Sequence, residues 1–221
     1  PGFIDANTVV DIFVTAQMIK QATAFLLEIL KDDREEDADL QTRLLDINLL
    51  YSPVVVADSI LGQNMFSHFN KQHIAQLCEK VGLYNRALEN YSSLSDRKRV
   101  IVNAQFMNSE WLVNFFGNNL SQEETLACLR ELLQNNIRQN LNLVVEVAHK
   151  YSNELGPSEL IKMFEDFHSF DGIFYYLSGV VDVSGQRVIP AGYGEYLREL
   201  GSLNDHALEI EVLIPLPPRH H

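Results

Sequence analysis

Basic residues are scarce in this sequence. Its 221 residues include 17 lysines and arginines against 30 aspartates and glutamates, which gives a formal net charge of -13. A surface this acidic repels phosphate backbones and anionic lipid headgroups, so nucleic acid and bare membrane are poor partners. Long apolar runs are missing too: none approaches the ~20 residues that a membrane-spanning helix needs, so we expect no direct membrane insertion.

Cysteine is also scarce, with only Cys78 and Cys128 in the chain. Both lie in segments whose apolar residues recur at helical spacing, which is typical of reduced thiols that pack as small hydrophobic side chains. Such use of cysteine fits a cytoplasmic protein better than a secreted one. We therefore expect two buried free thiols and a cytoplasmic location.

Motifs that carry catalysis are missing as well. There is no HExxH pair, P-loop or GxSxG elbow, and the cysteines lack the spacing of zinc ligands. Gly192-Tyr193-Gly194 lacks the third glycine and the preceding strand of a dinucleotide-binding loop. The internal histidines are His68, His73, His149, His168 and His206. The sequence therefore predicts no catalytic, cofactor-binding or metal-binding residue and no enzyme activity.

Helical periodicity is what the sequence has in abundance. Ile74, Leu77, Cys78 and Val81 occupy positions i, i+3, i+4 and i+7, and similar stripes recur along the chain. Strand-like alternation is nearly absent. The expected helices span 7–18, 20–31, 40–50, 53–61, 70–81, 84–94, 96–105, 109–117, 121–135, 138–152, 158–169 and 171–181.

The short breaks between these stripes carry the chemistry of helix ends. Gly82 and Gly156 stand where a helix-terminating glycine adopts a positive φ. Ser121 and Glu124 have capping-box spacing, and Pro53 suits the first turn of a helix. Because links this short force neighbouring helices antiparallel, the sequence predicts an all-α fold, an α-solenoid of short antiparallel helical hairpins. A compact bundle is the alternative, since no strict sequence period supports the repeat.

Residues 32–39 carry six acidic side chains in eight positions. A calcium loop needs spaced ligands, a central glycine and a terminal glutamate, and this segment lacks that pattern. Like charges repel and bury no apolar surface, so we expect a flexible, solvated loop that can be shortened without harm.

Two further clusters have structural interpretations. Trp111 and Phe115 lie four positions apart on one helical face, which predicts buried packing between hairpins rather than a ligand pocket. Arg97-Lys98-Arg99, the one basic cluster, is interpreted as a solvated helix face or as charges at a helix end.

The composition changes after Val183, where glycine and proline become frequent. We therefore divide the chain into a solenoid segment, 1–183, and a divergent or non-native C-terminal tail, 184–221. The final Arg219-His220-His221 has the composition of a purification-tag remnant, and Pro1 stands in place of an initiator methionine. The sequence is accordingly interpreted as a fragment of a longer chain.

Long colinear blocks, together covering about residues 7–183, resemble the clathrin heavy-chain family. Two weaker blocks are VVDIFVTAQMIKQATAFLLEIL at 9–30 and LQTRLLDINLL at 40–50. The closer blocks are IAQLCEKVGLYNRALENY at 74–91, KRVIVNAQFMNSEWLVNFFG at 98–117, IRQNLNLVVEVAHKYSNELG at 137–156 and FEDFHSFDGIFYYLSG at 164–179. The resemblance implies an α-solenoid of clathrin heavy-chain repeats from the distal leg, near the ankle.

The resemblance also implies a function. The expected role is a structural scaffold of a vesicle coat, a leg segment of the lattice that serves endocytosis and intracellular transport. The implied partners are other clathrin heavy-chain legs and, in the full-length protein, light chains, adaptors and uncoating cofactors. The implied location is cytoplasmic, on the cytoplasmic face of coated vesicles and coated pits.

The sequence leaves two other functions open. One is a helical-repeat subunit of a vacuolar tethering complex, because such subunits share the repeat. The other is a helical-repeat adaptor that binds a peptide in its concave groove. That adaptor would need a row of exposed apolar or charged side chains along one face of the solenoid.

Overall fold

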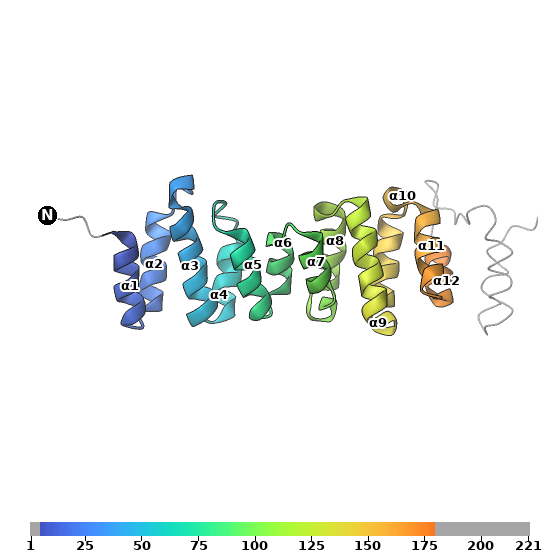
Figure 1. Ribbon diagram of the computed structural model, residues 1–221, viewed down its shortest axis with the longest axis horizontal. Coiled ribbons are helices and arrows are strands. Elements are labelled where there is room, and N and C mark those ends of the chain that lie inside the picture. Colours follow the sequence, from blue (N-terminus) through green and yellow to red (C-terminus); the bar gives the residue numbers. More distant parts are fainter. Residues whose placement is uncertain (1–4, 180–221) are drawn as a thin grey trace, which may run out of the picture. The chain divides into compact units, whose positions relative to one another are not determined.

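The computed structural model describes residues 5–179, and every regular element in that range is helical. The helices follow one another with short links, as Figure 1 shows. The prediction of an all-α helical-repeat solenoid is confirmed. The proposed tail at 184–221, His206 and the Gly192-Tyr193-Gly194 segment lie outside the described residues.

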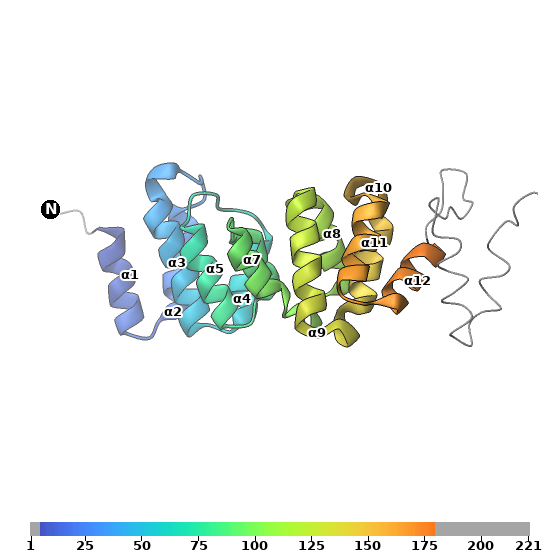
Figure 2. The same ribbon diagram turned by 45° about the vertical axis from the view of Figure 1, so that its right-hand side comes forward.

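The described residues fall into two units, 5–107 and 108–179. The first unit consists of α1 (Ala6–Thr15), α2 (Ile19–Ile29), the 3-10 helix η1 (Glu35–Asp37), α3 (Ala38–Tyr51), α4 (Val54–Gly62), α5 (Lys71–Lys80), α6 (Tyr84–Asn90), α7 (Leu94–Ile101) and the 3-10 helix η2 (Ala104–Phe106). Neighbouring helices pack against each other from α1 to α4 and from α5 to α7, and α3 also packs on α5. Figures 1 and 2 show the helices of this unit stacked in chain order.

The second unit consists of α8 (Ser109–Asn119), α9 (Gln122–Lys150), α10 (Ser152–Leu155), α11 (Pro157–Asp166) and α12 (Phe170–Gly179). Its centre is α9, which packs on the other four helices. The prediction of separate helices at 121–135 and 138–152 is confirmed, because Asn136 leaves helical geometry at φ -160 and ψ 94. The Asn136 side chain then accepts a hydrogen bond from the Gln139 backbone N–H at 3.1 Å, as the cap of a new helix does.

Apolar stripes fill the core of each unit. The stripe on α5 buries Ile74, Leu77 and Cys78, while Val81 is half-buried at the helix end. Cys78 and Cys128 are both free and fully buried, as expected. Burial raises the pKa of the Cys78 thiol to about 12, so this group is protonated at neutral pH.

The helix-end signals are largely confirmed. Ser121 and Glu124 form a complete capping box, and Gly82 and Gly156 have φ values of 83° and 84°. Pro53 differs slightly from expectation, because it precedes α4 as its N-cap instead of standing in the first turn. Helix α6 is four residues shorter than the predicted 84–94 element, since Tyr91 is extended and Ser93 caps α7.

The prediction of a flexible acidic loop at 32–39 is wrong. Glu35–Asp37 form η1, and Asp39 belongs to the first turn of α3. Asp33 accepts hydrogen bonds from Ser67 and Gln41, so part of the segment's charge is used in tertiary contacts. The charge count alone could not reveal these donors, which lie 8 and 34 residues away along the chain.

The prediction that Trp111 is buried is also wrong, although its pairing is correct. Trp111 stacks on Phe115 with ring centroids 5.3 Å apart, but its own side chain is only half-buried. Phe115 occupies the core position of the pair.

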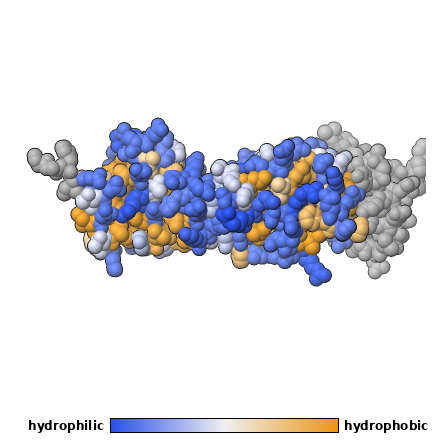
Figure 3. Space-filling model, viewed as in Figure 1, coloured by the Kyte–Doolittle hydropathy of each residue, from blue (hydrophilic) through white to orange (hydrophobic). Residues whose placement is uncertain are grey.

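The surface is largely hydrophilic on the face drawn in Figure 3, with apolar patches between the polar side chains. The most exposed large apolar residues are Phe106, Val55, Tyr51, Ile12 and Leu50. Within residues 5–179, each helix is too short or too polar to cross a bilayer.

Candidate functional site

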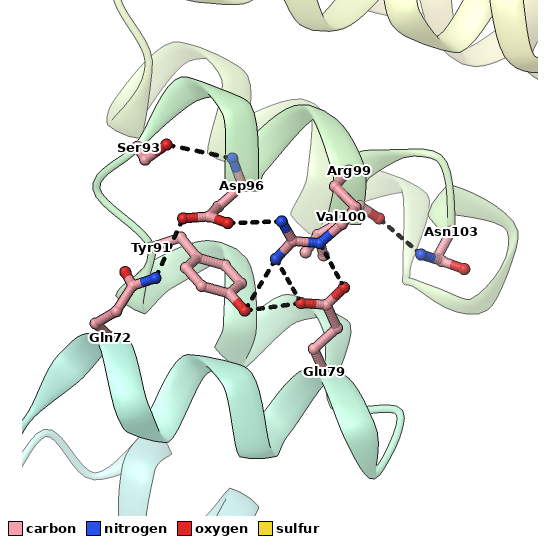
Figure 4. A network of polar contacts seen from close by, with 8 residues as sticks. All are labelled: Gln72, Glu79, Tyr91, Ser93, Asp96, Arg99, Val100 and Asn103. Atoms are coloured by element: carbon pink, nitrogen blue, oxygen red, sulfur yellow. Dashed lines mark hydrogen bonds and ion pairs between the residues drawn. The ribbon is translucent and has the colours of Figure 1, made fainter.

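One connected polar site of the first unit joins α5 to α7. Its geometry begins with the helix caps: the Asn70 side chain accepts from the His73 N–H at the start of α5, and the Ser93 hydroxyl accepts from the Asp96 N–H at the start of α7. Each helix then turns its apolar residues to the core, Cys78 on α5 and Val100 on α7. Glu79 and Arg99, each next to one of these core residues, lie at the edge of the helix interface (Figure 4).

Glu79 and Arg99 form a two-pronged ion pair. Arg99 Nε donates to Glu79 Oε1 at 3.0 Å, and Arg99 Nη2 donates to Oε2 at 2.9 Å. The third prong, Nη1, donates to Asp96 Oδ1 at 2.6 Å within α7. Paired N–H groups in a rigid fork fix the orientation of a carboxylate as well as its distance. The pair therefore holds α5 and α7 in one register.

Tyr91 completes the site from the link between α6 and α7. It is 1% exposed, and its hydroxyl donates to Glu79 Oε2 at 2.7 Å. The Arg99 guanidinium lies over its ring, 5.4 Å from the centroid, and donates to its hydroxyl at 3.2 Å. Gln72 adds a second bridge from α5, because its Nε2 donates to Asp96 Oδ2 at 3.2 Å (Figure 4).

The electrostatics of the site hold each group in one protonation state. Hydrogen bonds from Arg99 hold the pKa values of Glu79 and Asp96 below their usual ranges. Burial, with the neighbouring Glu79 carboxylate, raises the pKa of Tyr91 to about 12. A general acid or base works best with a pKa near the operating pH, and these three groups are shifted away from neutrality. The arrangement is therefore suited to fixing helices rather than to transferring protons.

The same kind of link recurs through the first unit, from one helix to the second helix after it. Four pairs form this polar ladder: Asp11–Arg43 from α1 to α3 at 2.6 Å, Asp46–His73 from α3 to α5 at 2.7 Å, Asp58–Arg86 from α4 to α6 at 2.7 Å, and Glu79–Arg99 from α5 to α7 at 2.9 Å. In each pair the acidic residue comes first in the chain. Side chains thus connect helices that are not consecutive in the chain.

The second unit has a counterpart with the opposite order. Arg130 on α9 donates to Asp166 on α11 at 2.7 Å. His149, also on α9, lies against the end of α12, where its Nε2 is 3.0 and 2.9 Å from the carbonyl oxygens of Tyr175 and Tyr176. Both contacts bind helices within the unit.

The sequence predicted no site residue and missed the ladder. Arg99 does stand in the last turn of α7, as the helix-end interpretation requires, but its head group binds α5 and not solvent alone. The two residues of each ladder pair lie 20 to 32 positions apart, and the separation differs from pair to pair. No fixed sequence period therefore predicts these pairs. Among the described residues, His, Cys, Asp and Glu form no group of three that could hold a metal ion.

Comparison with known proteins places the chain in a family. The sequence profile described as Region in Clathrin and VPS matches residues 2–141. The chain is 52% identical over 180 residues to the clathrin heavy chain of Drosophila melanogaster, a match that covers 81% of this chain and 11% of the relative. It is 51% identical over 199 residues to human clathrin heavy chain 2, covering 90% of this chain and 12% of the relative.

A less similar relative is also a clathrin heavy chain and again matches this chain over most of its length. The clathrin heavy chain of Dictyostelium discoideum is 45% identical over 203 residues, covering 91% of this chain and 12% of the relative. The chain thus spans only about an eighth of the length of the curated relatives that it matches. From the profile match, the helical-repeat fold and these relatives, we conclude that the chain belongs to the clathrin heavy-chain repeat family.

Proposed function

We propose that this chain is a non-catalytic strut of a clathrin-type vesicle coat, a segment of the heavy-chain leg that builds the lattice. The carrying observation is the polar ladder, set in a family whose curated relatives are clathrin heavy chains. In a helical-repeat array each hairpin contacts only its neighbours, and the ladder adds polar links between adjacent hairpins. Links that reach the second helix along the chain oppose bending and sliding of the stack, which suits a strut.

Charge and packing support the same proposal. An exposed ion pair such as Asp11–Arg43 contributes only about 0.2–1 kcal/mol, so this part of the ladder matters for register more than for total stability. Stability comes from the apolar stripes, which contribute about 1.5–3 kcal/mol for each large side chain that is fully buried. At the α5–α7 site, the pKa values of Glu79, Tyr91 and Asp96 are shifted away from neutrality, which favours a structural role over catalysis.

The partners and location follow from the proposal for a longer parent protein. Other heavy-chain legs are the direct partners of such a strut. Light chains, adaptors and uncoating cofactors are partners of the whole heavy chain, and the location is the cytoplasmic face of coated vesicles and coated pits. The acidic surface, with its net charge of -13, argues against direct binding to anionic lipid or nucleic acid.

The other two functions have less support. A vacuolar tethering subunit would share the repeat, but the curated relatives reported above are clathrin heavy chains. A peptide-binding adaptor would need an exposed row along the helices. The exposed Leu50, Tyr51 and Val55 lie instead at the end of α3 and the start of α4, around one hairpin corner.

A chimera tests the coat proposal. The matching segment of the Drosophila heavy chain is replaced by residues 5–179, and assembly of the purified chimera into lattices is measured by sedimentation and electron microscopy. We expect assembly close to that of the parent. A matched chimera carrying Glu79→Gln and Arg86→Gln should keep its helical spectrum and assemble less completely. A chimera that folds but does not sediment would contradict the coat proposal.

A further inference from the structure

The loop between α4 and α5, residues 63–70, is anchored to the corner between α2 and α3. Phe66 and Phe69 are buried, so the backbone between them is drawn against the protein. The backbone N–H groups of this link lie outside a helix, so their protein acceptors must come from elsewhere in the fold. The acceptors come from Asp33, Gln41 and Thr42, which precede the loop by one hairpin.

Asp33 receives three hydrogen bonds. The Ser67 N–H donates to Oδ1 at 3.0 Å, and the Ser67 hydroxyl donates to Oδ2 at 2.7 Å. Gln41 Nε2 also donates to Oδ1, at 2.8 Å. The bonds from Ser67, the largest cause, hold the pKa of Asp33 below its usual range, so its carboxylate is charged at neutral pH.

Gln41 and Thr42 extend the contact toward α5. Gln41 is fully buried, and its Oε1 accepts from the His68 N–H at 2.9 Å. The Thr42 hydroxyl accepts from the Asn70 N–H at 2.8 Å. Asn70 is the N-cap of α5, because its side chain accepts from the His73 N–H at 3.1 Å. A continuous series of hydrogen bonds therefore runs from the α2–α3 corner to the start of α5.

The backbone of Asp33 has an unusual conformation for a residue other than glycine. Its φ is 45°, a left-handed conformation that glycine adopts most easily and aspartate only with some strain. The Asp33 carboxylate meets the donors of a distant loop, so the residue at this corner makes a tertiary contact as well as the turn.

We propose that Asp33, Gln41 and Thr42 form a corner latch that fixes loop 63–70 and, through Asn70, the N-terminus of α5. The latch couples the α2–α3 corner to the next hairpin and meets the polar ladder at His73, whose backbone N–H donates to the Asn70 side chain. It is a conformational device: with the latch closed the loop has one position, and with it open the loop and the first turn of α5 exchange with solvent.

Asp33→Gly is the sharpest test, because it removes the carboxylate and relieves the backbone strain. The control is Gln17→Gly, since Gln17 lies at the exposed α1–α2 corner with a φ of 59°. Backbone hydrogen exchange of the whole 221-residue chain is measured at Ser67, His68 and Asn70. We expect exchange at Ser67 and His68 to rise by at least about tenfold in Asp33→Gly and to stay unchanged in Gln17→Gly.

Thr42→Val keeps the proposal testable if Asp33→Gly fails to fold. Valine preserves the shape of threonine but removes the acceptor for one amide, so exchange should rise at Asn70 and in the first turn of α5. Ser67 should keep its protection, because its bonds to Asp33 are untouched. Unchanged exchange at residues 67–70 in Asp33→Gly, or at Asn70 in Thr42→Val, would overturn the latch.

Discussion

Tyr91 and Arg99 share one acceptor, because both donate to Oε2 of Glu79, at 2.7 and 2.9 Å. The buried phenol and the half-exposed guanidinium thus depend on a single carboxylate, which comes from a different helix. Removal of the Glu79 charge should therefore weaken the hydrogen bonds of both Tyr91 and Arg99. Glu79 is accordingly the residue through which the α5–α7 site can be tested most directly.

Glu79→Gln should destabilise the first unit by about 1–3 kcal/mol, because hydrogen bonds to charged groups are worth about that much and the buried Tyr91 hydroxyl loses its ionic acceptor. Urea denaturation followed by circular dichroism measures the change. Glu28→Gln is the control, since Glu28 forms an exposed pair with Lys31 within one turn. Equal effects of the two substitutions would show that the α5–α7 site is no stronger than an ordinary surface pair.

Tyr91 also predicts a pH dependence. Its pKa is raised to about 12 in the folded protein, against about 10 for an unperturbed phenol. The folded state therefore holds this proton longer than the unfolded state. Its contribution to stability is complete below about pH 10 and is lost as the pH rises toward about 12.

Denaturation across this alkaline range should therefore separate two variants. Tyr91→Phe should lose stability with rising pH less steeply than the parent, because it lacks the ionising group. Tyr51→Phe alters an exposed tyrosine and serves as the control. Cys78, whose pKa is also raised to about 12, contributes a slope of the same sign to all three proteins. Identical slopes for Tyr91→Phe and the parent would refute the assignment.

Much of the fold could be predicted because its signals are local. The Ser121 capping box, the glycines at positive φ and the break near Asn136 each depend on residues within a few positions of one another. The latch and the ladder could not be predicted in this way. Asp33 meets Ser67 from 34 residues away, and the partners of the ladder meet only after the hairpins have stacked. The prediction that Trp111 is buried failed for a related reason. The spacing of the two residues identified Phe115 as its partner, but it did not show which of the two rings faces the core.

Trp111→Ala should accordingly cost less than a fully buried aromatic would, about 1–3 kcal/mol against the ~3–5 kcal/mol typical of complete burial. Trp111 is the one tryptophan of the chain, so its fluorescence in the parent reports the unfolding of α8. The stability of the variant is measured by circular dichroism. Phe115→Ala, which removes the buried ring of the stacked pair, should be the more damaging change. The reverse order would mean that Trp111 carries the packing.

Gly172→Ala should be destabilising, although alanine normally favours a helix over glycine by about 0.5–1 kcal/mol. A Cβ at this position of α12 would lie 2.4 Å from Phe164 Cδ1 and 2.7 Å from Ser169 Oγ. Such overpacking costs about 1–3 kcal/mol, so the expected sign is reversed. Ser178→Ala, near the exposed end of α12, is the comparison. Thermal denaturation measures both, and a raised melting temperature for Gly172→Ala would contradict the close packing.

The Asp58–Arg86 rung of the ladder should be the most sensitive to mutation of its cation. The Arg86 side chain is only 18% exposed, and it donates to Asp58 Oδ1 at 2.7 Å and to Glu89 Oε2 at 2.9 Å. Its guanidinium also covers Gly62 at the end of α4. Arg86→Ala therefore removes packing and deprives the Asp58 and Glu89 carboxylates of their shared cation, which should cost about 1–3 kcal/mol.

A double-mutant cycle of Asp58→Ala and Arg86→Ala isolates the link between α4 and α6 from the lost packing. We expect a coupling energy of about 1–2 kcal/mol, because the arginine is mostly shielded from solvent. The matched cycle of Arg130→Ala and Asp166→Ala probes a more exposed pair in the second unit and should give about 0.2–1 kcal/mol. Added salt should weaken the second coupling more than the first, since solvent ions screen exposed charges better. A coupling for Asp58–Arg86 no larger than that of the exposed pair would mean that Arg86 acts through packing alone, and that this rung does not hold α4 to α6 electrostatically.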